Sequence, residues 1–285
     1  MHISVMKKEV IDLLNVKAGQ LYIDCTFGQG GHTEAILEQG GVVISIDRDS
    51  STLIYENRIK NQFQDNFKFV NDSFSNIFEI WQNNAFPVKP DGILFDLGFS
   101  SNQIEDPNRG FSFLYDSSLD MRYDNHENSE TALTLINSLK EEDLSEIFIK
   151  YGEEFNGKKI AKKICTSRKI KKIESCFEFL KILSDFNQSS KKHYATKIFQ
   201  ALRIYVNKEF QHIEKGIDDA MKILKPFGKI VVITFHSLED RIIKNKFQNK
   251  NILYPTEAEI KENVRSRSAK VRWFINNLNE EELDI

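Results

Sequence analysis

Cysteine is scarce in this chain, and its few copies lack the spacing of the usual cysteine-based scaffolds. Among 285 residues there are only three cysteines, Cys25, Cys165 and Cys176, and no two of them form a Cys-x-x-Cys pair. An odd number without that spacing argues against a disulfide framework and a thiolate zinc site. We therefore expect reduced thiols, as in the cytosol.

Long apolar stretches are also absent. No uncharged run approaches the ~18 residues that a membrane helix needs, and the first ten residues alternate apolar and charged types. Apolar residues make up 40% and charged residues 28%, which is typical of a globular protein and excludes a disordered, collagen-like or coiled-coil chain. We expect a soluble, cytoplasmic protein with one large domain or two ordinary ones.

Positive charge is missing overall but present locally. The 39 basic and 42 acidic residues give a formal net charge of −3, so the molecule as a whole has no field that attracts nucleic acid. However, residues 158–172 include eight basic residues and no acid, and residues 241–272 include nine basic residues and three acids. One such run is typical of a solvated helix face, whereas two of them favour contacts with a polyanion.

Short apolar runs alternate with helical segments in the first hundred residues, and one more run follows the turn at Pro226, Phe227 and Gly228. Such alternation predicts βαβ units and a parallel sheet, hence an α/β fold. The predicted strands are 21–27, 42–46, 67–70, 92–97 and 229–235.

The middle of the chain shows helical periodicity alone. Apolar residues recur at helical spacing at Leu144, Ile147, Phe148 and Tyr151, at Ile160 and Ile164, and at Phe177, Leu180 and Leu183. Ser138 and Glu141 predict a capping box before the first of these helices. The predicted organisation is therefore a sheet domain in two parts with a helical insertion between them: 1–105, 106–200 and 201–285.

A glycine-rich segment, DCTFGQGGH, runs from Asp24 to His32 at the end of the first predicted strand. Glycines there let the backbone approach a ligand at the carboxyl ends of the strands, where open α/β sheets bind cofactors. A nicotinamide dinucleotide is one alternative, but its usual third glycine would fall at Thr33, and Asp24 would repel a pyrophosphate. The carboxylate of Asp24 suits an ammonium group, such as the amino acid end of S-adenosylmethionine.

Polar and aromatic residues follow the next three predicted strands. Asp47 stands where an acid accepts hydrogen bonds from the ribose hydroxyls of either cofactor, or where it serves only a strand-end turn. Phe74 is a candidate to stack on adenine, although an aromatic at a strand end belongs to the core at least as often. Asp96 and Gln103 lie in a polar loop that borders the same edge of the sheet, and we expect them to reach cofactor or substrate.

Ordered motifs along nearly the whole chain resemble the bacterial 16S ribosomal RNA cytosine-N(4) methyltransferase family. They are HISVM (2–6), DxTxGxGGH (24–32), DLGxSSxQ (96–103), RGFSF (109–113), LDMR (119–122), YGEE (151–154), FQALRI (199–204), FHSLEDR (235–241) and RSRSAK (265–270). The chain departs from the family pattern at Phe99, Asn102, Tyr194, Lys197 and Thr234.

This resemblance implies a class I methyltransferase (Rossmann-like) sheet with an inserted helical domain that helps to recognise RNA. It implies transfer of a methyl group from S-adenosylmethionine to the N(4) amine of a cytidine in the decoding region of 16S ribosomal RNA, within the assembled small subunit. The cofactor contacts that it implies are Gly30, Gly31, His32, Asp47, Phe74, Asp96 and Gln103.

The chemistry itself needs positioning more than a strong base or a metal. The amine of cytosine is a poor nucleophile, so it must be held in line with the methyl group while an acceptor takes its proton. Asp96 is the candidate acceptor, and the base must leave its stack to reach it. The candidate substrate contacts are Ser100, Asp120, Arg122, His236, Arg265 and Arg267.

Several alternatives stay open at this point. Arg122 could simply pair with Asp120, and His236 beside Ser237 suggests a hydrolase triad, although no G-x-S-x-G elbow surrounds the serine. The six histidines lack the spacing of metal ligands, so no metal is expected. A nicotinamide-dependent dehydrogenase would leave the basic insertion unexplained, and a non-catalytic RNA-binding assembly factor would make the polar loops superfluous.

Overall fold

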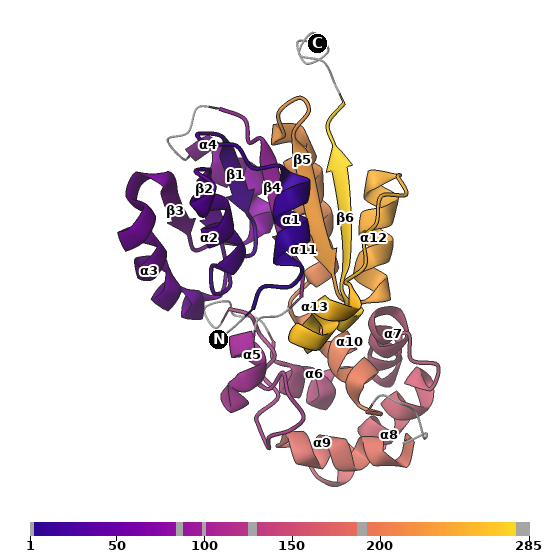
Figure 1. Cartoon of the computed structure of the whole chain (residues 1–285). Helices are drawn as coiled ribbons and strands as arrows, with labels where there is room; N and C mark the ends of the chain where they lie inside the picture. Colours follow the sequence, from indigo (N-terminus) through magenta and orange to yellow (C-terminus); the bar gives the residue numbers. More distant parts are fainter. Residues whose placement is uncertain (1–2, 84–87, 99–100, 125–129, 187–192, 278–285) are drawn as a thin grey trace. The chain divides into compact units, whose positions relative to one another are not determined.

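The computed structural model describes residues 3–83, 88–98, 101–124, 130–186 and 193–277 (Figure 1). The chain forms two compact units, residues 1–98 with 210–285 and residues 99–209. The insertion therefore extends beyond the predicted 106–200 at both ends. A boundary at residue 200 would cut helix α10 (Thr196–Val206), in which Phe199 and Leu202 both belong to the core of the second unit.

A six-stranded sheet in the order β3-β2-β1-β4-β5-β6 forms the centre of the first unit. The five parallel strands confirm the prediction: β1 (Leu21–Asp24), β2 (Val42–Ile46), β3 (Phe67–Val70), β4 (Gly92–Asp96) and β5 (Lys229–Thr234). The sixth, β6 (Lys270–Ile275), runs antiparallel to β5 and has no clear signal in the sequence. Its buried Arg272 argues against a strand, yet the Nε of this side chain lies 2.6 Å from Oδ1 of Asp240.

Alternate strand residues are buried on opposite faces of the sheet, as Tyr22 and Ile23 show. The face of Tyr22 packs against α1 (Lys7–Leu14), α2 (Gly31–Glu38) and α3 (Leu53–Phe63). The face of Ile23 packs against α4 (Ile77–Asn83), α11 (Glu209–Ile223) and α12 (Ser237–Phe247). Because both faces are covered, the inner parallel strands are largely apolar, which is why the sequence reveals them, whereas the edge strand β3 contains the exposed Lys68.

Helices form all the regular structure described in the second unit, apart from short 3-10 turns. Besides α10 they are α5 (Ser101–Glu105), α6 (Ala132–Ser138), α7 (Glu141–Gly152), α8 (Gly157–Ile170) and α9 (Cys176–Leu183). Leu144, Ile147 and Phe148 of α7 lie in a single apolar core, as predicted. Within the described ranges, none of the helices has the length and apolar character that crossing a bilayer requires.

Two local predictions in this unit are wrong. Ser138 is the last residue of α6, and α7 begins after Lys140, which has no capping side-chain hydrogen bond. Glu141 and its two acidic neighbours stabilise this start through the helix dipole instead. Phe177 of α9 is 49% exposed, because Cys176 and Phe179 occupy the buried face in its place.

Candidate active site

The loop between β1 and α2 is folded tightly by its glycines. Gly28 and Gly30 have φ angles of 53° and 82°, which side chains rarely adopt. A Cβ atom on Gly30 would lie 2.9 Å from the ring of Phe27, and one on Gly31 would lie 2.1 Å from Oγ of Ser4. The chain therefore leaves β1 at Asp24, earlier than predicted, and packs its bare backbone at the carboxyl edge of the sheet.

Replacing Gly30 by alanine should destabilise the fold more than the same change at Gly19. Gly19 has a similar φ of 74°, but a Cβ atom there would meet no other atom within 4 Å, so only the backbone cost of about 1–2 kcal/mol applies. At Gly30 the contact with Phe27 adds to this cost. Urea unfolding of both variants measures the difference, and equal free energies of unfolding would contradict the steric argument.

Asp47 fastens this loop to the end of β2. Its Oδ2 accepts a hydrogen bond from the N–H of Gly28 at 2.8 Å, and its Oδ1 accepts one from the N–H of Asp49 at 2.9 Å. Burial raises the pKa of Asp47 to about 6, although both hydrogen bonds favour the ionised form. The carboxylate is thus costly to keep charged, and it still has acceptor capacity for a ligand.

Asp24 is buried beneath the loop and accepts hydrogen bonds from it. Its side chain is buried, Oδ2 accepts a hydrogen bond from Oγ1 of Thr33 at 2.7 Å, and Oδ1 accepts one from the N–H of Thr26 at 3.1 Å. Burial raises its pKa, and the neighbouring His32 opposes that shift. Both oxygens of Asp24 are thus already engaged. Holding the loop in place and providing negative charge near the site suits Asp24 better than the expected direct contact with an ammonium group.

His32 and Asp96 leave polar atoms unused at the end of β4. Nε2 of His32 lies 3.7 Å from Oδ2 of Asp96, and His32 is 5% exposed. Among the described residues, neither ring nitrogen of His32 nor Oδ1 of Asp96 has a hydrogen-bond partner. The backbone N–H of Asp96 donates to Oγ1 of Thr26 at 2.7 Å, which fixes the backbone of Asp96 at the loop. Buried polar atoms without partners indicate a ligand position.

Phe74 begins a short 3-10 turn, Phe74–Asn76, after β3. Its ring meets that of Phe95 edge to face, with centroids 5.5 Å apart, and lies against Gly216 of α11. A Cβ atom on Gly216 would lie 2.7 Å from Phe74 Cδ2. The ring is only partly buried in this packing, so its predicted stacking on adenine stays a prediction.

The remaining predicted cofactor contact belongs to the second unit. Gln103 is buried in α5. Ser100, predicted to contact substrate, lies outside the described residues.

Asp120 and Arg122 form the ion pair that the sequence left open. Nε of Arg122 lies 2.8 Å from Oδ1 of Asp120, and Nη2 lies 2.8 Å from Oδ2. The flanking Leu119 and Met121 have φ angles of 51° and 61°, although neither is a glycine. Asn207 fixes this backbone by donating to the carbonyl of Met121 at 2.7 Å. A strained turn held in this way is typical of functional sites, so contact with RNA stays a prediction.

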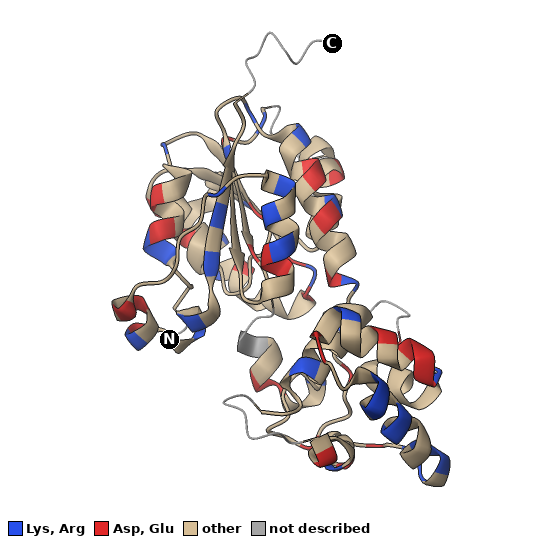
Figure 2. Ribbon diagram, turned by 90° about the vertical axis from the view of Figure 1, so that its right-hand side faces the viewer, with Lys and Arg blue, Asp and Glu red and all other residues tan. Residues whose placement is uncertain are grey.

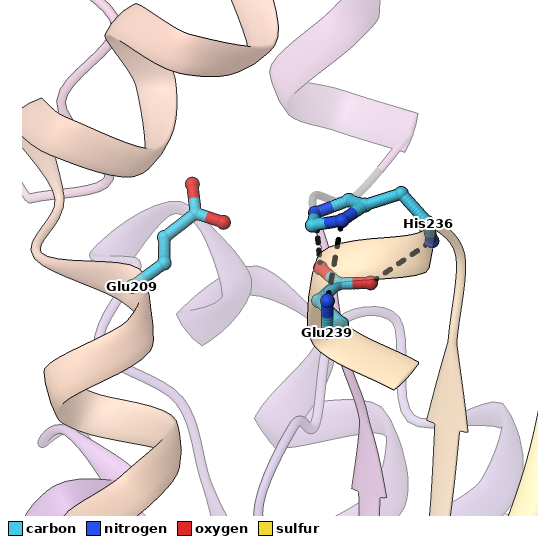
Figure 3. Close-up of side chains that lie close together, drawn as sticks. All are labelled: Glu209, His236 and Glu239. Atoms are coloured by element: carbon cyan, nitrogen blue, oxygen red, sulfur yellow. Dashed lines mark hydrogen bonds and ion pairs between the residues drawn. The ribbon is translucent and has the colours of Figure 1, made fainter. Parts of the chain in front are cut away.

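His236 caps α12 (Figure 3). Its Nδ1 accepts a hydrogen bond from the N–H of Glu239 at 3.3 Å, while Oε2 of Glu239 accepts one from the N–H of Phe235 at 2.8 Å. Nε2 lies 3.0 Å from Oε1 of the same glutamate, an ion-pair distance when the imidazole is protonated. Both ring nitrogens thus face Glu239, which disfavours the hydrolase triad with Ser237.

Arg265 and Arg267 lie in a 3-10 turn, Val264–Ser268, and both are exposed. Between them Ser266 is fully buried, and its Oγ donates to the carbonyl of Asn263 at 2.7 Å. Ser266 therefore turns inward while the two arginines that flank it turn outward. This arrangement suits phosphate contacts, as the sequence indicated.

Part of the positive charge of residues 241–272 is neutralised by acidic residues that lie outside this segment. Lys270 and Arg272 pair with Asp240, and Lys246 pairs with Asp218 at 2.7 Å. Burial would raise the pKa of Asp240, but hydrogen bonds from Arg272 and Lys270 lower it below its usual value. The positive charge available to a partner in this region is therefore smaller than the sequence suggests.

The sequence profile of the MraW methylase family matches residues 1–253. The chain belongs to this family. It is similar to ribosomal RNA small subunit methyltransferase H of Ehrlichia chaffeensis, with 41% identity over 296 residues that cover 96% of this chain and 99% of the relative. The enzyme of the same name from Dictyoglomus thermophilum is 42% identical over 286 residues, covering 95% of each chain.

The sequence did not predict the hydrogen-bonded threonine and serine residues that support Asp24 and Asp96. Thr26 accepts a hydrogen bond from Asp96, and Thr33 joins Asp24 to Ser45, with 2.7 Å between the hydroxyl oxygens of Thr33 and Ser45. Small hydroxyl residues in a loop have no distinctive pattern of their own. Only the hydrogen-bond requirement of buried Asp24 could have indicated them.

Proposed function

We propose that this protein transfers a methyl group from S-adenosylmethionine to the exocyclic N(4) amine of a cytidine in the decoding region of 16S ribosomal RNA. The observation that supports the cofactor best is the set of carboxylates at one edge of the sheet. Asp47, Asp24 and Asp96 follow or end three adjacent strands, β2, β1 and β4. A parallel sheet binds its ligand at this edge.

The charge of these carboxylates favours this cofactor over a nicotinamide dinucleotide. S-adenosylmethionine has a positive sulfonium and a positive ammonium group, whereas a dinucleotide has a negative pyrophosphate. Three acids near one loop attract the former and repel the latter. The free polar atoms of His32 and Asp96 provide hydrogen-bonding capacity for such a ligand.

Each predicted cofactor contact suits a different part of S-adenosylmethionine. Asp47 accepts hydrogen bonds from ribose hydroxyls, and Phe74 covers the adenine ring. Gly30 and Gly31 let the backbone approach the ligand, and His32 and Asp96 provide polar atoms at the end of β4. When bound, the cofactor supplies an electrophilic methyl group.

Asp96 is also the candidate acceptor for the proton that leaves the amine. Its Oδ1 has no hydrogen-bond partner in the part of the chain that the structure describes, and its backbone is fixed by Thr26. An oriented carboxylate can hold one N–H of the amine so that the nitrogen lone pair faces the methyl group.

The substrate is proposed to be the assembled small ribosomal subunit in the cytoplasm. The relatives are named as ribosomal RNA small subunit methyltransferases. Exposed arginines at positions 265 and 267 and the lysines of α8 suit phosphate contacts, which favour a folded RNA whose target base can be splayed out.

Tritiated-methyl transfer to three substrates tests this function. We expect strong labelling of small subunits that lack the modification, weaker labelling of naked 16S RNA and little labelling of a short unstructured oligonucleotide. Nucleoside mass spectrometry should then find methyl on N(4) of cytidine. Methyl at carbon-5, or equal labelling of the oligonucleotide, would overturn the proposal. Binding of NAD but not S-adenosylmethionine in calorimetry would favour the dehydrogenase instead.

A further inference from the structure

Phe155, between α7 and α8, is the most exposed large apolar side chain in the described part of the protein. Its exposed fraction is 95%, against 49% for Phe177 in the same unit. An exposed phenylalanine leaves a large apolar area in water, a loss that burying the ring against a partner would reverse. This ring therefore offers a face to a binding partner.

Hydrogen bonds hold the turn that contains Phe155 in a fixed conformation. The N–H groups of Glu153 and Glu154 donate to carbonyls of α7 at 3.1 and 3.2 Å, and the N–H of Asn156 donates to Oε1 of Glu154 at 2.9 Å. Lys197 of α10 donates to the carbonyl of Glu153 at 2.9 Å, and its Nζ lies 5.5 Å from the centroid of the Phe155 ring. The ring is thus held outward by a fixed backbone, with a cation beside it.

The helix that follows has one lysine-rich face. Lys158, Lys159, Lys162, Lys163 and Lys169 are exposed, while Ile160, Ala161, Ile164 and Cys165 fill the opposite, buried face. Figure 2 shows these lysines as blue bands along the helix at the lower right.

Most of this charge is free to meet a partner. Lys163 pairs with Asp185 at 2.7 Å, whereas Lys158, Lys159, Lys162 and Lys169 have no ion pair with any described residue. From Lys158 to Lys169 the helix rises about 16 Å. Phe155 precedes the first of these lysines by three positions, so an aromatic ring stands at the start of a row of positive charge.

We propose that Phe155 and the lysine face of α8 form a docking surface for a single-stranded segment of ribosomal RNA, with an unpaired base stacked on the ring and the adjoining phosphates on the lysines. This inference rests on the proposed RNA substrate. Bases within a duplex have both faces covered, so only an unstacked base can use the ring. Stacking on aromatics beside a positive groove is the usual mode of single-strand binding. The surface holds RNA independently of the cofactor loop.

Fluorescence anisotropy of the full chain with a labelled single-stranded RNA and with a duplex, both without cofactor, tests this surface. Phe155→Ala should weaken single-strand binding about tenfold and leave duplex binding unchanged. Phe155→Trp should preserve it, because the larger ring still stacks. The matched control is Phe177→Ala, which removes a half-exposed phenylalanine outside the lysine face and should change nothing.

Charge reversal tests the lysines separately. Lys158→Glu, Lys159→Glu and Lys162→Glu together should weaken RNA binding and lower the salt slope by about 2, as expected when three phosphate contacts are lost. The control reverses Lys7, Lys17 and Lys68, three exposed lysines of the first unit, with the same change in net charge. Equal effects of the two triple variants would show a general charge effect and overturn the docking surface.

The remaining outcomes separate this inference from the proposed function. Calorimetry should give unchanged S-adenosylmethionine affinity for every variant, which shows an intact first unit. Normal methylation by the wild type with unaltered RNA binding by Phe155→Ala would overturn the docking surface alone. Absence of methylation by the wild type would overturn the function. Binding to anionic vesicles that depends on Phe155, without an effect on RNA, would assign the surface to a membrane and also overturn the inference.

Discussion

Replacing Asp47 by alanine is expected to weaken S-adenosylmethionine binding by about 1–3 kcal/mol, roughly 5- to 150-fold. The carboxylate accepts hydrogen bonds from the N–H groups of Gly28 and Asp49 and has acceptor capacity left for two ribose hydroxyls. The variant leaves all these donors without their partner. Calorimetry measures the affinity, and wild-type affinity would refute the assignment.

A matched control is the same substitution at the other edge of the sheet. Asp91 precedes β4 and pairs with Lys225 at 2.8 Å, so Asp91→Ala also removes a structural carboxylate from a strand end. Because it lies at the amino end of its strand, we expect cofactor affinity to stay at the wild-type value. Equal losses in the two variants would mean that Asp47→Ala acts only by loosening the fold.

The raised pKa of Asp47 gives this prediction a pH dependence. Burial raises the pKa to about 6, so the free protein holds a proton at this carboxyl below that pH. Ribose hydroxyls favour the ionised form, and binding below pH 6 must therefore release the proton. Affinity should fall about tenfold from pH 7 to pH 5. The α-amino group of the cofactor does not titrate in this range.

Calorimetry at pH 6 in two buffers with different ionisation enthalpies measures the released proton directly. We expect about half a proton per cofactor bound for the wild type and none from this position in Asp47→Ala. Asp24, whose pKa is also raised by burial, is present in both proteins and cancels in the comparison. The same proton release in both would exclude Asp47 as its source.

The sign of the effect on folding is opposite to that on binding. A carboxyl whose pKa is higher in the folded state than in the unfolded chain binds more protons when folded, between about pH 4 and pH 6. The contribution of Asp47 to the free energy of unfolding should therefore decrease as the pH rises through this window. The protein keeps a charge that costs stability at neutral pH, as expected for a group kept for ligand binding.

The sequence was sufficient for the parallel sheet because its inner strands are buried on both faces and are largely apolar. It failed at β6, where Arg272 interrupts the apolar pattern and is neutralised by Asp240, thirty-two positions earlier. It failed again at Phe177, because helical spacing alone does not say which of several overlapping apolar sets faces the core. Both failures involve tertiary contacts that no local pattern records.

At the candidate site the sequence predicted which residues lie there better than it predicted their hydrogen-bond partners. The acid at the end of β2 was expected to face a ligand, and its second role, accepting the N–H of Gly28, became visible only when the loop folded back. Asp24 was expected to contact an ammonium group, yet Thr33 and Thr26 already occupy its oxygens. The proximity of His32 and Asp96 depends on sheet order, which brings β1 beside β4.

Replacing Asp96 by asparagine is expected to slow methyl transfer about 100-fold while S-adenosylmethionine affinity falls less than tenfold. Asparagine keeps the shape and one acceptor oxygen, so the contacts of the side chain are largely preserved. It has no negative charge to hold an N–H of the target amine or to accept its proton. The single-turnover rate at saturating cofactor measures the first effect, and calorimetry measures the second.

His32→Ala separates this role of Asp96 from simple cofactor binding. Nε2 of His32 lies 3.7 Å from the Asp96 carboxylate, so its loss disturbs the same corner of the site but leaves the acceptor in place. We expect the single-turnover rate of His32→Ala to fall much less than that of Asp96→Asn. If Asp96→Asn instead keeps the wild-type rate at saturating cofactor and loses only affinity, then Asp96 is a cofactor ligand and another group takes the proton. Oδ1 of Asp96 has no hydrogen-bond partner among the described residues and is therefore available to the target amine. We thus expect Asp96→Asn to lower the single-turnover rate more than the cofactor affinity.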